Sequence, residues 1–501
     1  MKIVSFLRNY ALIIFIWLSG LFLRCYRQAA LLGFYYDQGR DAQIATDIIA
    51  GRNFPAIGPT TGINGLYFGP FWYYLITPGY FIGQGNPAIA SYFISFLESL
   101  TIPLIFFLVK TWWRLDSAYL ASIIWAYSHY LVRSARWFSN PSPLPTFVLL
   151  IMFVCLRVIN KKEFRLLPLL AILLALSLQL EAASAVFFFP VLILFFLLNH
   201  RQWLNWPRFY WLKSLLAFVA LLLPQVVFEV KNHFILSQNL LSFLVGRINT
   251  STGKTWSIPD YNFIISRLLV YYQSFFSKLD TNLTLGSMAI LSIFLLGLLY
   301  LLRYLIFSPF IKLQILWLFL PLFILLFFSG NYGILYDYYL TGLFPAFVIL
   351  VSVIFTLPKN KIIYFTLLFG FAYLFYRGNY LHLKNYLSAD TDGPLHITLG
   401  NELLALDYLC QKRQIQDGNL DIYVPPVIPH SYNYLISWRQ KHHLCPNFSF
   451  SPNKIVYLIY EVDPHHPERL INWLDRYKAD SILDIKQFGG VFVQMNRRKI
   501  N

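Results

Sequence analysis

The sequence predicts an all-α polytopic membrane protein of about eleven transmembrane helices, followed by a small α/β domain at the C-terminus. Composition is the first observation behind this prediction: of 501 residues, 57% are hydrophobic and only 13% are charged. A soluble protein of this size could not cover its surface with so few charges. The second observation is the recurrence of long apolar runs, and the third is the clustering of basic residues in the short connections between them.

The predicted transmembrane helices are apolar runs that approach the roughly 20 residues needed to cross a hydrocarbon core. Neighbouring helices shield the ends of the shorter runs. The runs lie at residues 9–28, 87–109, 116–132, 144–159, 166–181, 183–199, 213–230, 286–303, 313–329, 338–357 and 360–377. Residues 1–377 are therefore expected to form one transmembrane domain.

Basic residues in the short connections predict the orientation of the chain. If the N-terminus is cytoplasmic, the basic residues of the inner connections include Lys110, Arg114, Lys161, Lys162, Lys359 and Lys361. This distribution follows the positive-inside rule. We therefore predict a multi-pass protein of the plasma (inner) membrane with an extracytoplasmic C-terminal domain. The net charge of +17 is scattered over these connections, which favours contact with anionic lipid and not with nucleic acid.

Three predicted outer segments are long: residues 29–86, 231–285 and 378–501. The first holds two expected surface helices, one at residues 40–50 with Gly51 as its stop signal and one at the aromatic run 71–81, expected to lie at the membrane interface. In the last, strand-like runs alternate with helical patterns, which predicts a small α/β domain. The strand-like runs are 420–424, 454–462, 482–485 and 491–495, and the helical patterns are 401–413, 432–442 and 467–477.

The four cysteines do not form a disulfide framework. Cys25 and Cys155 lie in apolar runs and are expected only to pack. Cys410 and Cys445 both fall in the C-terminal segment, where an oxidising compartment would permit a bridge. Spacing alone does not fix whether they pair.

The first outer segment carries the strongest candidates for chemistry. Asp37, Arg40 and Asp41 follow the first apolar run closely, near the expected membrane surface. The two carboxylates are four residues apart and share a face if the stretch is helical. The alternative is that Asp37 is simply the N-cap of the helix at 40–50, a role that Asp favours.

Other ionisable residues stand at the ends of predicted spans. Glu181, Glu229 and Asp337 are candidates for a cavity within the bundle, because an ionisable group in a membrane segment is often functional. Exposure at the interface explains each of them equally well. The pair His442-His443 and the stretch 463–466 lack the ligand spacing of a metal site and are expected to be solvated.

Several stretches match a known family in order along the chain. They are Asp37 after the first span, the aromatic run 69–75, the Arg…Asn-Pro turn at 136–143, the span end at 224–231 and the stretch 338–345. In this order they resemble the multi-span glycosyltransferases of the GT-C superfamily. The resemblance is to the family of the protein mannosyltransferases and the aminoarabinose transferase of lipid A, glycosyltransferase family 39.

The resemblance implies a GT-C-like fold and an enzyme, a hexosyl- or pentosyltransferase. Such an enzyme moves a sugar from a polyprenyl-phosphate donor to a lipid, glycan or protein acceptor at the outer face, usually with inversion. It implies that Asp37 is the base or orients the acceptor, with Asp41 the second carboxylate nearby, and that Arg40 and Arg136 hold the donor phosphate. A carboxylate can take the acceptor proton, and a guanidinium offers phosphate two parallel hydrogen bonds. Both arginines could instead reach toward lipid headgroups.

The sequence departs from the family pattern at two places. Gln38 follows Asp37 where relatives often carry Glu, and Phe68 and Gly69 replace an acidic-basic pair of the aminoarabinose transferase. In the aminoarabinose transferase that pair supplies a metal ligand and a phosphate-binding lysine. Here a divalent metal stays possible but the sequence does not support it, and no cofactor is certain.

Two other functions remain open. A transporter or flippase of a lipid-linked saccharide is one, although the sequence shows no matching pair of interrupted spans. A polymerase or ligase of surface glycans is the other. The absence of a nucleotide-binding fingerprint favours a lipid-linked donor over a nucleotide sugar. For a transferase, Asp37 should face a cavity shared with Arg136 and the segment 231–285.

Overall fold

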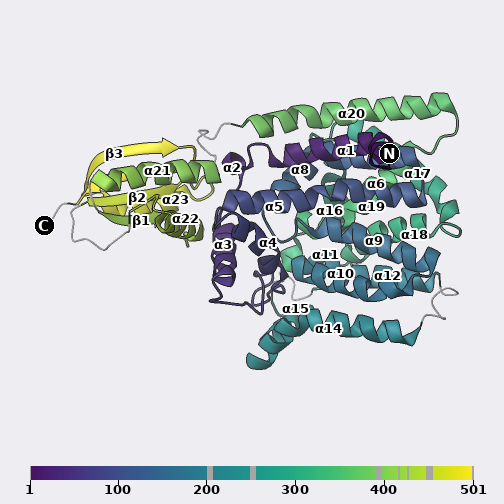
Figure 1. Cartoon of the computed structure of the whole chain (residues 1–501), viewed down its shortest axis with the longest axis horizontal. Coiled ribbons are helices and arrows are strands. Elements are labelled where there is room, and N and C mark those ends of the chain that lie inside the picture. Colours follow the sequence, from purple (N-terminus) through teal and green to yellow (C-terminus); the bar gives the residue numbers. More distant parts are fainter. Residues whose placement is uncertain are drawn as a thin grey trace.

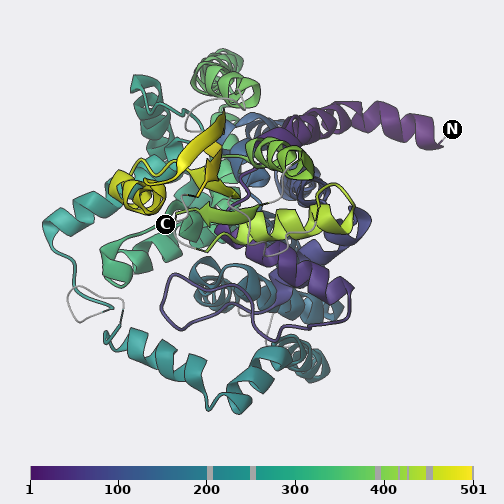
Figure 2. The ribbon, with the colours of Figure 1, turned by 90° about the vertical axis from the view of Figure 1, so that its left-hand side faces the viewer.

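The computed structural model describes residues 2–199, 207–248, 255–389, 397–415, 418–425, 428–446 and 455–498. Most of these residues form a bundle of roughly aligned helices, and the C-terminal residues form a separate α/β unit at one end of it (Figure 1). Viewed from that end, the C-terminal unit lies over the end of the bundle and not along its side (Figure 2).

Each apolar run that predicted a transmembrane helix is helical, which confirms a multi-helix, multi-pass membrane protein. Among the described residues, five helical stretches are long and apolar enough to cross a membrane outright: Pro87–Trp112, Leu144–Lys161, Arg208–Lys231, Leu285–Tyr304 and Asp337–Phe355. Several shorter apolar helices accompany them. The total of eleven spans and the orientation stay predictions.

The bundle helices are often broken within one predicted span. They are α1 (Lys2–Cys25), α5 (Pro87–Ser99), α6 (Thr101–Trp112), α7 (Leu115–Tyr127), α8 (His129–Arg136), α9 (Leu144–Lys161), α10 (Leu167–Leu180), α11 (Ala182–Ala185), α12 (Phe188–Leu197), α14 (Arg208–Lys231), α17 (Leu285–Leu301), α18 (Pro309–Leu325), α19 (Phe344–Phe355) and α20 (Lys361–Ser388). Short 3₁₀ turns join some of them: η1 (Phe164–Leu166), η2 (Leu302–Tyr304), η3 (Asn331–Gly333) and η4 (Asp337–Leu343). The breaks at Ser128 and Glu181 place polar side chains inside the bundle.

The first outer segment is more helical than predicted. It contains α2 (Gln28–Leu31), α3 (Tyr36–Ile49) and α4 (Phe71–Ile82). The expectation of a helix at 40–50 with Asp37 as its N-cap is wrong: α3 begins at Tyr36 and Asp37 lies in its first turn. The side chain of Gln38 caps the helix instead, accepting a hydrogen bond of 3.1 Å from the Tyr35 amide. Gly51 has φ +69°, as a helix stop requires.

The expected loop at 231–285 contains two helices, α15 (Ile235–Leu244) and α16 (Tyr261–Phe276). Helix α16 packs into the main core of the bundle through Tyr271, Phe275 and Phe276. The apolar pattern did not predict this helix, because polar residues such as Asp260 before it and Arg267 within it interrupt the apolar run. Arg267 is buried and donates to the carbonyl of Phe328 at 2.7 Å.

The C-terminal unit is a small mixed sheet with helices on both faces. The strands β1 (Asn419–Tyr423), β2 (Ile455–Glu461), β3 (Ser481–Phe488) and β4 (Val491–Arg497) lie in the order β1-β2-β4-β3. β1 is parallel to β2, and the other neighbours are antiparallel. The helices are α21 (Leu399–Ile415), α22 (His430–Lys441) and α23 (Pro467–Leu474), followed by the turn η5 (Asp475–Tyr477). Residue 454, expected in a strand, lies outside the described residues.

Two further features of this unit bear on function. Cys410 and Cys445 form a disulfide, which joins α21 to the segment after α22. The second hydrophobic core of the molecule is shared across the boundary between the first outer segment and the C-terminal unit. It includes Phe34, Trp72 and Tyr80 from the former and Tyr432 and Tyr457 from the latter.

Candidate active site

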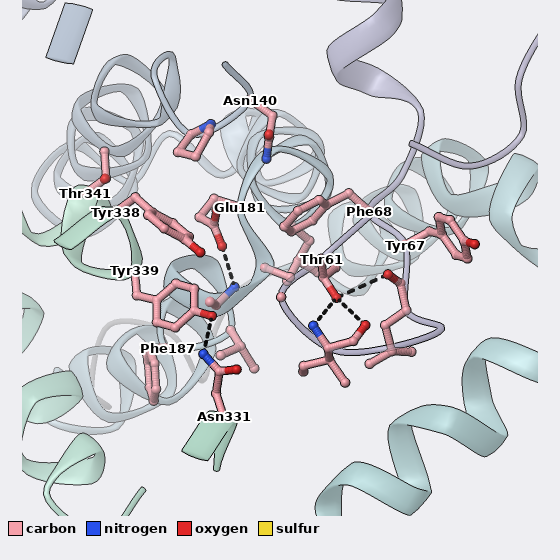
Figure 3. Close-up of a pocket in the computed structure, with 18 of the residues that line it drawn as sticks. Thr61, Tyr67, Phe68, Asn140, Glu181, Phe187, Asn331, Tyr338, Tyr339 and Thr341 are labelled. Atoms are coloured by element: carbon pink, nitrogen blue, oxygen red, sulfur yellow. Dashed lines mark hydrogen bonds between the residues drawn. The ribbon is translucent and has the colours of Figure 1, made fainter. Parts of the chain in front are cut away.

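A cavity of about 1400 Å³ opens at the end of the bundle that carries the outer segment. Its walls come from α3, the turn at residues 60–68, α8 and the turn after it, the break between α10 and α11, α14, α15, the end of α16 and η4. Figure 3 shows part of this lining, with Thr61 and Phe68 on one side and Tyr338 and Tyr339 on the other. The volume exceeds that of a usual small-molecule pocket, about 300–1,000 Å³.

Four of the carboxylates singled out in the sequence line this cavity: Asp37, Glu181, Glu229 and Asp337. Two cations line it as well, Arg133 and Lys278, and sequence reasoning missed both. Arg40, Asp41 and Arg136 are not among the lining residues. The cavity is thus shared by Asp37 and the segment 231–285, as a transferase requires, but Arg136 is not part of it.

Asp37 stands at the mouth of the cavity in a network of charges. Its Oδ1 lies 2.9 Å from Nη1 of Arg40, and its side chain is 63% exposed. The same guanidinium donates to Oδ1 of Asp41 from Nε at 3.0 Å and from Nη2 at 2.7 Å. Trp72 donates to the other oxygen of Asp41 at 2.7 Å. Arg40 therefore bridges the exposed carboxylate of Asp37 to the buried one of Asp41, and its charge is already committed.

Asp41 is the buried member of this network. Burial raises its pKa to about 6, while the hydrogen bonds from Arg40 and Trp72 oppose the rise. At neutral pH the group is therefore mostly ionised, which keeps Arg40 in place beside Asp37. Geometry makes Asp41 an anchor of the arginine and not a second group facing the cavity.

Arg136 is a structural residue in this arrangement. Its side chain is buried, and its Nη1 donates to the carbonyls of Leu23 at 2.9 Å, Arg24 at 3.3 Å and Tyr26 at 2.7 Å. These carbonyls end α1, where backbone acceptors lack helical partners. In this placement the guanidinium of Arg136 binds the carbonyls at the end of α1. The placement therefore does not favour the expected contact between Arg136 and the donor phosphate.

Arg133 and Lys278 are the cations that face the cavity. Arg133 lies one turn before Arg136 on α8 and is exposed, with no ion pair or hydrogen bond among the part of the chain that the structure describes. Lys278 is 3% exposed, and its Nζ lies 3.1 Å from both carboxylate oxygens of Asp337. Its ammonium also stands 4.9 Å from the ring centre of Tyr130 and 4.5 Å from that of Phe344.

Glu181 sits at the break between α10 and α11, and its side chain is only 1% exposed. Its Oε1 accepts one backbone hydrogen bond, from Ala183 at 3.2 Å, and no cation pairs with it among the described residues. Figure 3 shows its carboxylate and the ring of Tyr338 pointing into the same space. Asn331 and Tyr339 lie beside them, joined by a hydrogen bond of 3.2 Å.

Glu229 has a more local task. It accepts hydrogen bonds from the amides of Leu236 at 2.8 Å and Ser237 at 2.9 Å, and so caps α15 from the end of α14. The residues between them, His233 and Phe234, have positive φ angles and form a tight hinge. Glu229 therefore holds the helix that walls the cavity.

Two of the motifs that resemble the family contact the end of α10. Asn140, in the Arg…Asn-Pro turn, donates to the carbonyl of Leu180 at 2.5 Å and so fixes the break that carries Glu181. At Gly69, a side chain would overlap Gln179, whose Oε1 accepts from the amide of Phe71 at 3.2 Å. Both motifs thus tie the outer segment and α8 to the end of α10.

The histidine-rich stretches do not converge on a metal site. Nε2 of His442 donates to the carbonyl of Gln84 at 2.9 Å, and His466 lies 3.2 Å from Glu468. Within the described ranges no three His, Cys, Asp or Glu side chains group as metal ligands would.

Comparison with known proteins identifies the fold. Residues 69–228 match the family model of the dolichyl-phosphate-mannose-protein mannosyltransferases. The search of curated proteins finds no match. Among solved structures, ArnT from Cupriavidus metallidurans bound to undecaprenyl phosphate has a TM-score of 0.59 at 12% identity, covering 98% of both chains. Its apo form has a TM-score of 0.58 at 12% identity, covering 99% of this chain and 98% of that one.

A more distant similarity points the same way. The oligosaccharyltransferase of Archaeoglobus fulgidus, in complex with Zn and sulfate, has a TM-score of 0.51 at 12% identity, covering 90% of this chain and 67% of that one. The similarity to the protein mannosyltransferase family is therefore confirmed by the family model over residues 69–228, and the fold resembles that of ArnT over nearly the whole chain.

Proposed function

We propose that the protein is a membrane glycosyltransferase that moves a sugar from a polyprenyl-phosphate donor to an acceptor hydroxyl at the outer face of the membrane. The observation that carries the proposal is the cavity itself. It places an exposed carboxylate, Asp37, and two cations, Arg133 and Lys278, around one space in an ArnT-like fold.

The reaction needs one base and a stabilised leaving group. In the proposed step the acceptor hydroxyl gives its proton to Asp37 while its oxygen bonds to the anomeric carbon. The bond from that carbon to the phosphate oxygen breaks on the opposite side, and the polyprenyl phosphate leaves with the electron pair. Attack and departure on opposite faces invert the anomeric centre. Arg40 orients Asp37 through their ion pair of 2.9 Å.

The donor phosphate is assigned to Arg133 and Lys278. The donor phosphodiester carries one negative charge and gains a second as the polyprenyl phosphate leaves, so a phosphate placed between the two cations would gain charge-assisted hydrogen bonds from both. Arg133 is free to turn toward it, and Lys278 would exchange part of its contact with Asp337 for the phosphate. This assignment replaces Arg40 and Arg136, whose guanidinium groups already have partners.

The glycosyl group is assigned to the region of Glu181 and Tyr338. A buried carboxylate without a cation needs donors, and sugar hydroxyls supply them. The apolar lining of α14 and α15, which includes Leu222, Val226 and Leu240, suits the isoprenoid chain. Helix α14 has no buried residue, so this wall can be reached from lipid.

The test is sugar transfer by the purified protein in lipid nanodiscs. A panel of radiolabelled undecaprenyl-phosphate sugars, both hexoses and pentoses, is offered together with an extract of envelope glycolipids and glycans as acceptors. We expect transfer from at least one donor. Asp37→Asn should lower it by a factor of 10² or more, the usual range for loss of a general base.

Asp47→Asn is the matched control, because Asp47 lies on the same helix, pairs with Arg52 and is absent from the cavity lining. It should keep wild-type transfer. Equal activity of Asp37→Asn and wild type would remove Asp37 from the mechanism but leave the reaction. Failure of every donor, together with movement of the labelled lipid between leaflets, would support a flippase instead.

A further inference from the structure

We infer that the C-terminal unit is a positioning element of the active site, and that α22 holds the helix that carries Asp37. This inference rests on the proposed function for its catalytic meaning, but its structural part stands separately. The inference is argued from the contacts that the C-terminal unit makes with α3, with the segment before α3 and with the turn at residues 84–85.

The contact between α3 and α22 is backbone to backbone. Gly39 is buried, and a methyl group in its place would overlap the backbone of His430 and Ser431, lying 2.6 Å from the carbonyl oxygen of His430. Two helices can approach this closely only where one of them has no side chain. Gly39 is two residues from Asp37, so a displacement at this contact moves the carboxylate directly.

His430 adds a side-chain contact at the same place. Its ring stacks edge-on against Tyr36, with centres 4.7 Å apart. Burial and the Arg40 guanidinium lower the pKa of His430, while Asp37 opposes the fall. The neutral imidazole thus lies within the field of the Asp37–Arg40 pair without competing for either charge.

Hydrogen bonds fasten the C-terminal unit on both sides of this contact. At the start of α3, Tyr35 donates to the carbonyl of Ile397 at 3.0 Å, and the amide of Leu399 donates to Leu32 at 2.8 Å. One turn further along α22, Tyr434 donates to the carbonyl of Gly85 at 2.6 Å. Trp438 donates to Gln84 at 3.0 Å.

Helix α3 is held from the bundle side as well. Gln38 donates from Nε2 to the carbonyl of Phe138 at 3.0 Å, just after α8. The helix is therefore held between the bundle and α22, and Ala42 and Ala45 on its buried face belong to the shared hydrophobic core. Such a clamp fixes the distance between Asp37 on α3 and Arg133 on α8, which a bond-forming step must hold within a fraction of an ångström.

The experiment compares Gly39→Ala with Gly370→Ala in the full-length protein in nanodiscs. Both glycines are helical, but nothing lies within 4 Å of a methyl group at Gly370. We expect Gly39→Ala to raise amide exchange in α3 at least tenfold and leave α9 within twofold. It should lower kcat at least tenfold, while the Kd for undecaprenyl phosphate and the acceptor KM stay within twofold. Gly370→Ala should match wild type in all five quantities.

A second variant covers the case in which Gly39→Ala does not fold. His430→Ala removes the ring from Tyr36 without inserting an atom and should shift α3 exchange and kcat in the same direction, by at least threefold. Unchanged α3 exchange in the variants that fold, or raised exchange with unchanged kcat, would overturn the inference. If wild type transfers no sugar, the proposed function fails, and the exchange data alone decide whether α22 holds α3.

Discussion

Two arginines one turn apart on α8 have opposite surroundings. Arg136 is buried and satisfies three carbonyls at the end of α1, whereas Arg133 is exposed and faces the cavity. The Arg…Asn-Pro motif includes Arg136, so the resemblance proposed Arg136 for the donor phosphate, whereas the cavity lining includes Arg133. Which of two nearby side chains turns inward depends on packing, which residue types alone do not encode.

This difference predicts separable phenotypes. Arg133→Gln should raise the Kd for undecaprenyl phosphate about tenfold or more and leave Tm nearly unchanged, because it removes a charge from an exposed site. Arg136→Gln should instead lower Tm, because each buried carbonyl left without a donor costs about 1–3 kcal/mol.

Isothermal titration with undecaprenyl phosphate and thermal unfolding measure the two effects. Arg52→Gln, an exposed arginine of the outer segment, is the control for net charge. A loss of lipid affinity in Arg136→Gln equal to that in Arg133→Gln, without a fall in Tm, would return the phosphate role to Arg136.

At the scale of elements, two buried carboxylates of the C-terminal unit lie close together, one on β2 and one on α21. Burial raises the pKa of Glu461, at the end of β2, to about 7, although Tyr432 of α22 donates to it at 2.9 Å. Burial and the charge of Glu461 also raise the pKa of Glu402, on α21, above its ordinary range. Both groups sit where α21 and α22 meet the sheet.

Glu461 makes the stability of this unit depend on pH. From pH about 4.5 to about 7 the folded protein keeps a proton that the unfolded chain has lost, so stability is highest below this window and falls as pH rises through it. The loss from Glu461 is about 3 kcal/mol for a shift of this size. Glu461→Gln should remove this part of the slope. Amide exchange of β2 at pH 5 and pH 8 measures it, and equal slopes in the two proteins would contradict the assignment.

The disulfide is a second determinant of this unit. Cys410 and Cys445 are 35 residues apart, and closing a loop of that length stabilises the fold by about 4 kcal/mol in the chain-entropy model. Replacing both by serine should loosen α22 against α21 and raise exchange in α22, and in α3 with it. Cys155→Ser, in the bundle, should leave α3 unaffected. If amide exchange in α3 does not change when the disulfide is removed, the shared hydrophobic core alone is enough to hold α3.

The sequence predicted helices and strands better than it predicted contacts between residues that are distant along the chain. Long apolar runs and alternating strand patterns follow from local periodicity, so the bundle helices and the four strands were expected within a few residues. Helix α16 was missed because Arg267 interrupts its apolar face, and that arginine donates to the carbonyl of Phe328, which is distant in the sequence. Asp37 was found by its place after the first span. Lys278 was not, because only the fold brings it to Tyr130 and Asp337.

At the scale of the whole molecule, one end differs from the other. The C-terminal unit and α3 lie together at one end of the bundle (Figure 1), and Asp37 of α3 lines the cavity. The disulfide of the C-terminal unit requires an oxidising compartment to persist. The basic connection that holds Lys359 lies at the opposite end of the bundle, where α20 begins before it runs toward the C-terminal unit (Figure 1). Charge and redox chemistry therefore predict the same orientation from independent residues.

Labelling in intact cells tests this orientation. In a background with Cys25→Ser, a cysteine at the exposed Arg469 should react with a membrane-impermeant maleimide before lysis, and one at the exposed Lys359 only after it. The reverse pattern would place the cavity on the cytoplasmic side. A carboxylate and two cations around an open cavity could then serve a donor from the cytoplasm, and the proposal of transfer at the outer face would fail. The labelling pattern thus decides which donors are worth offering.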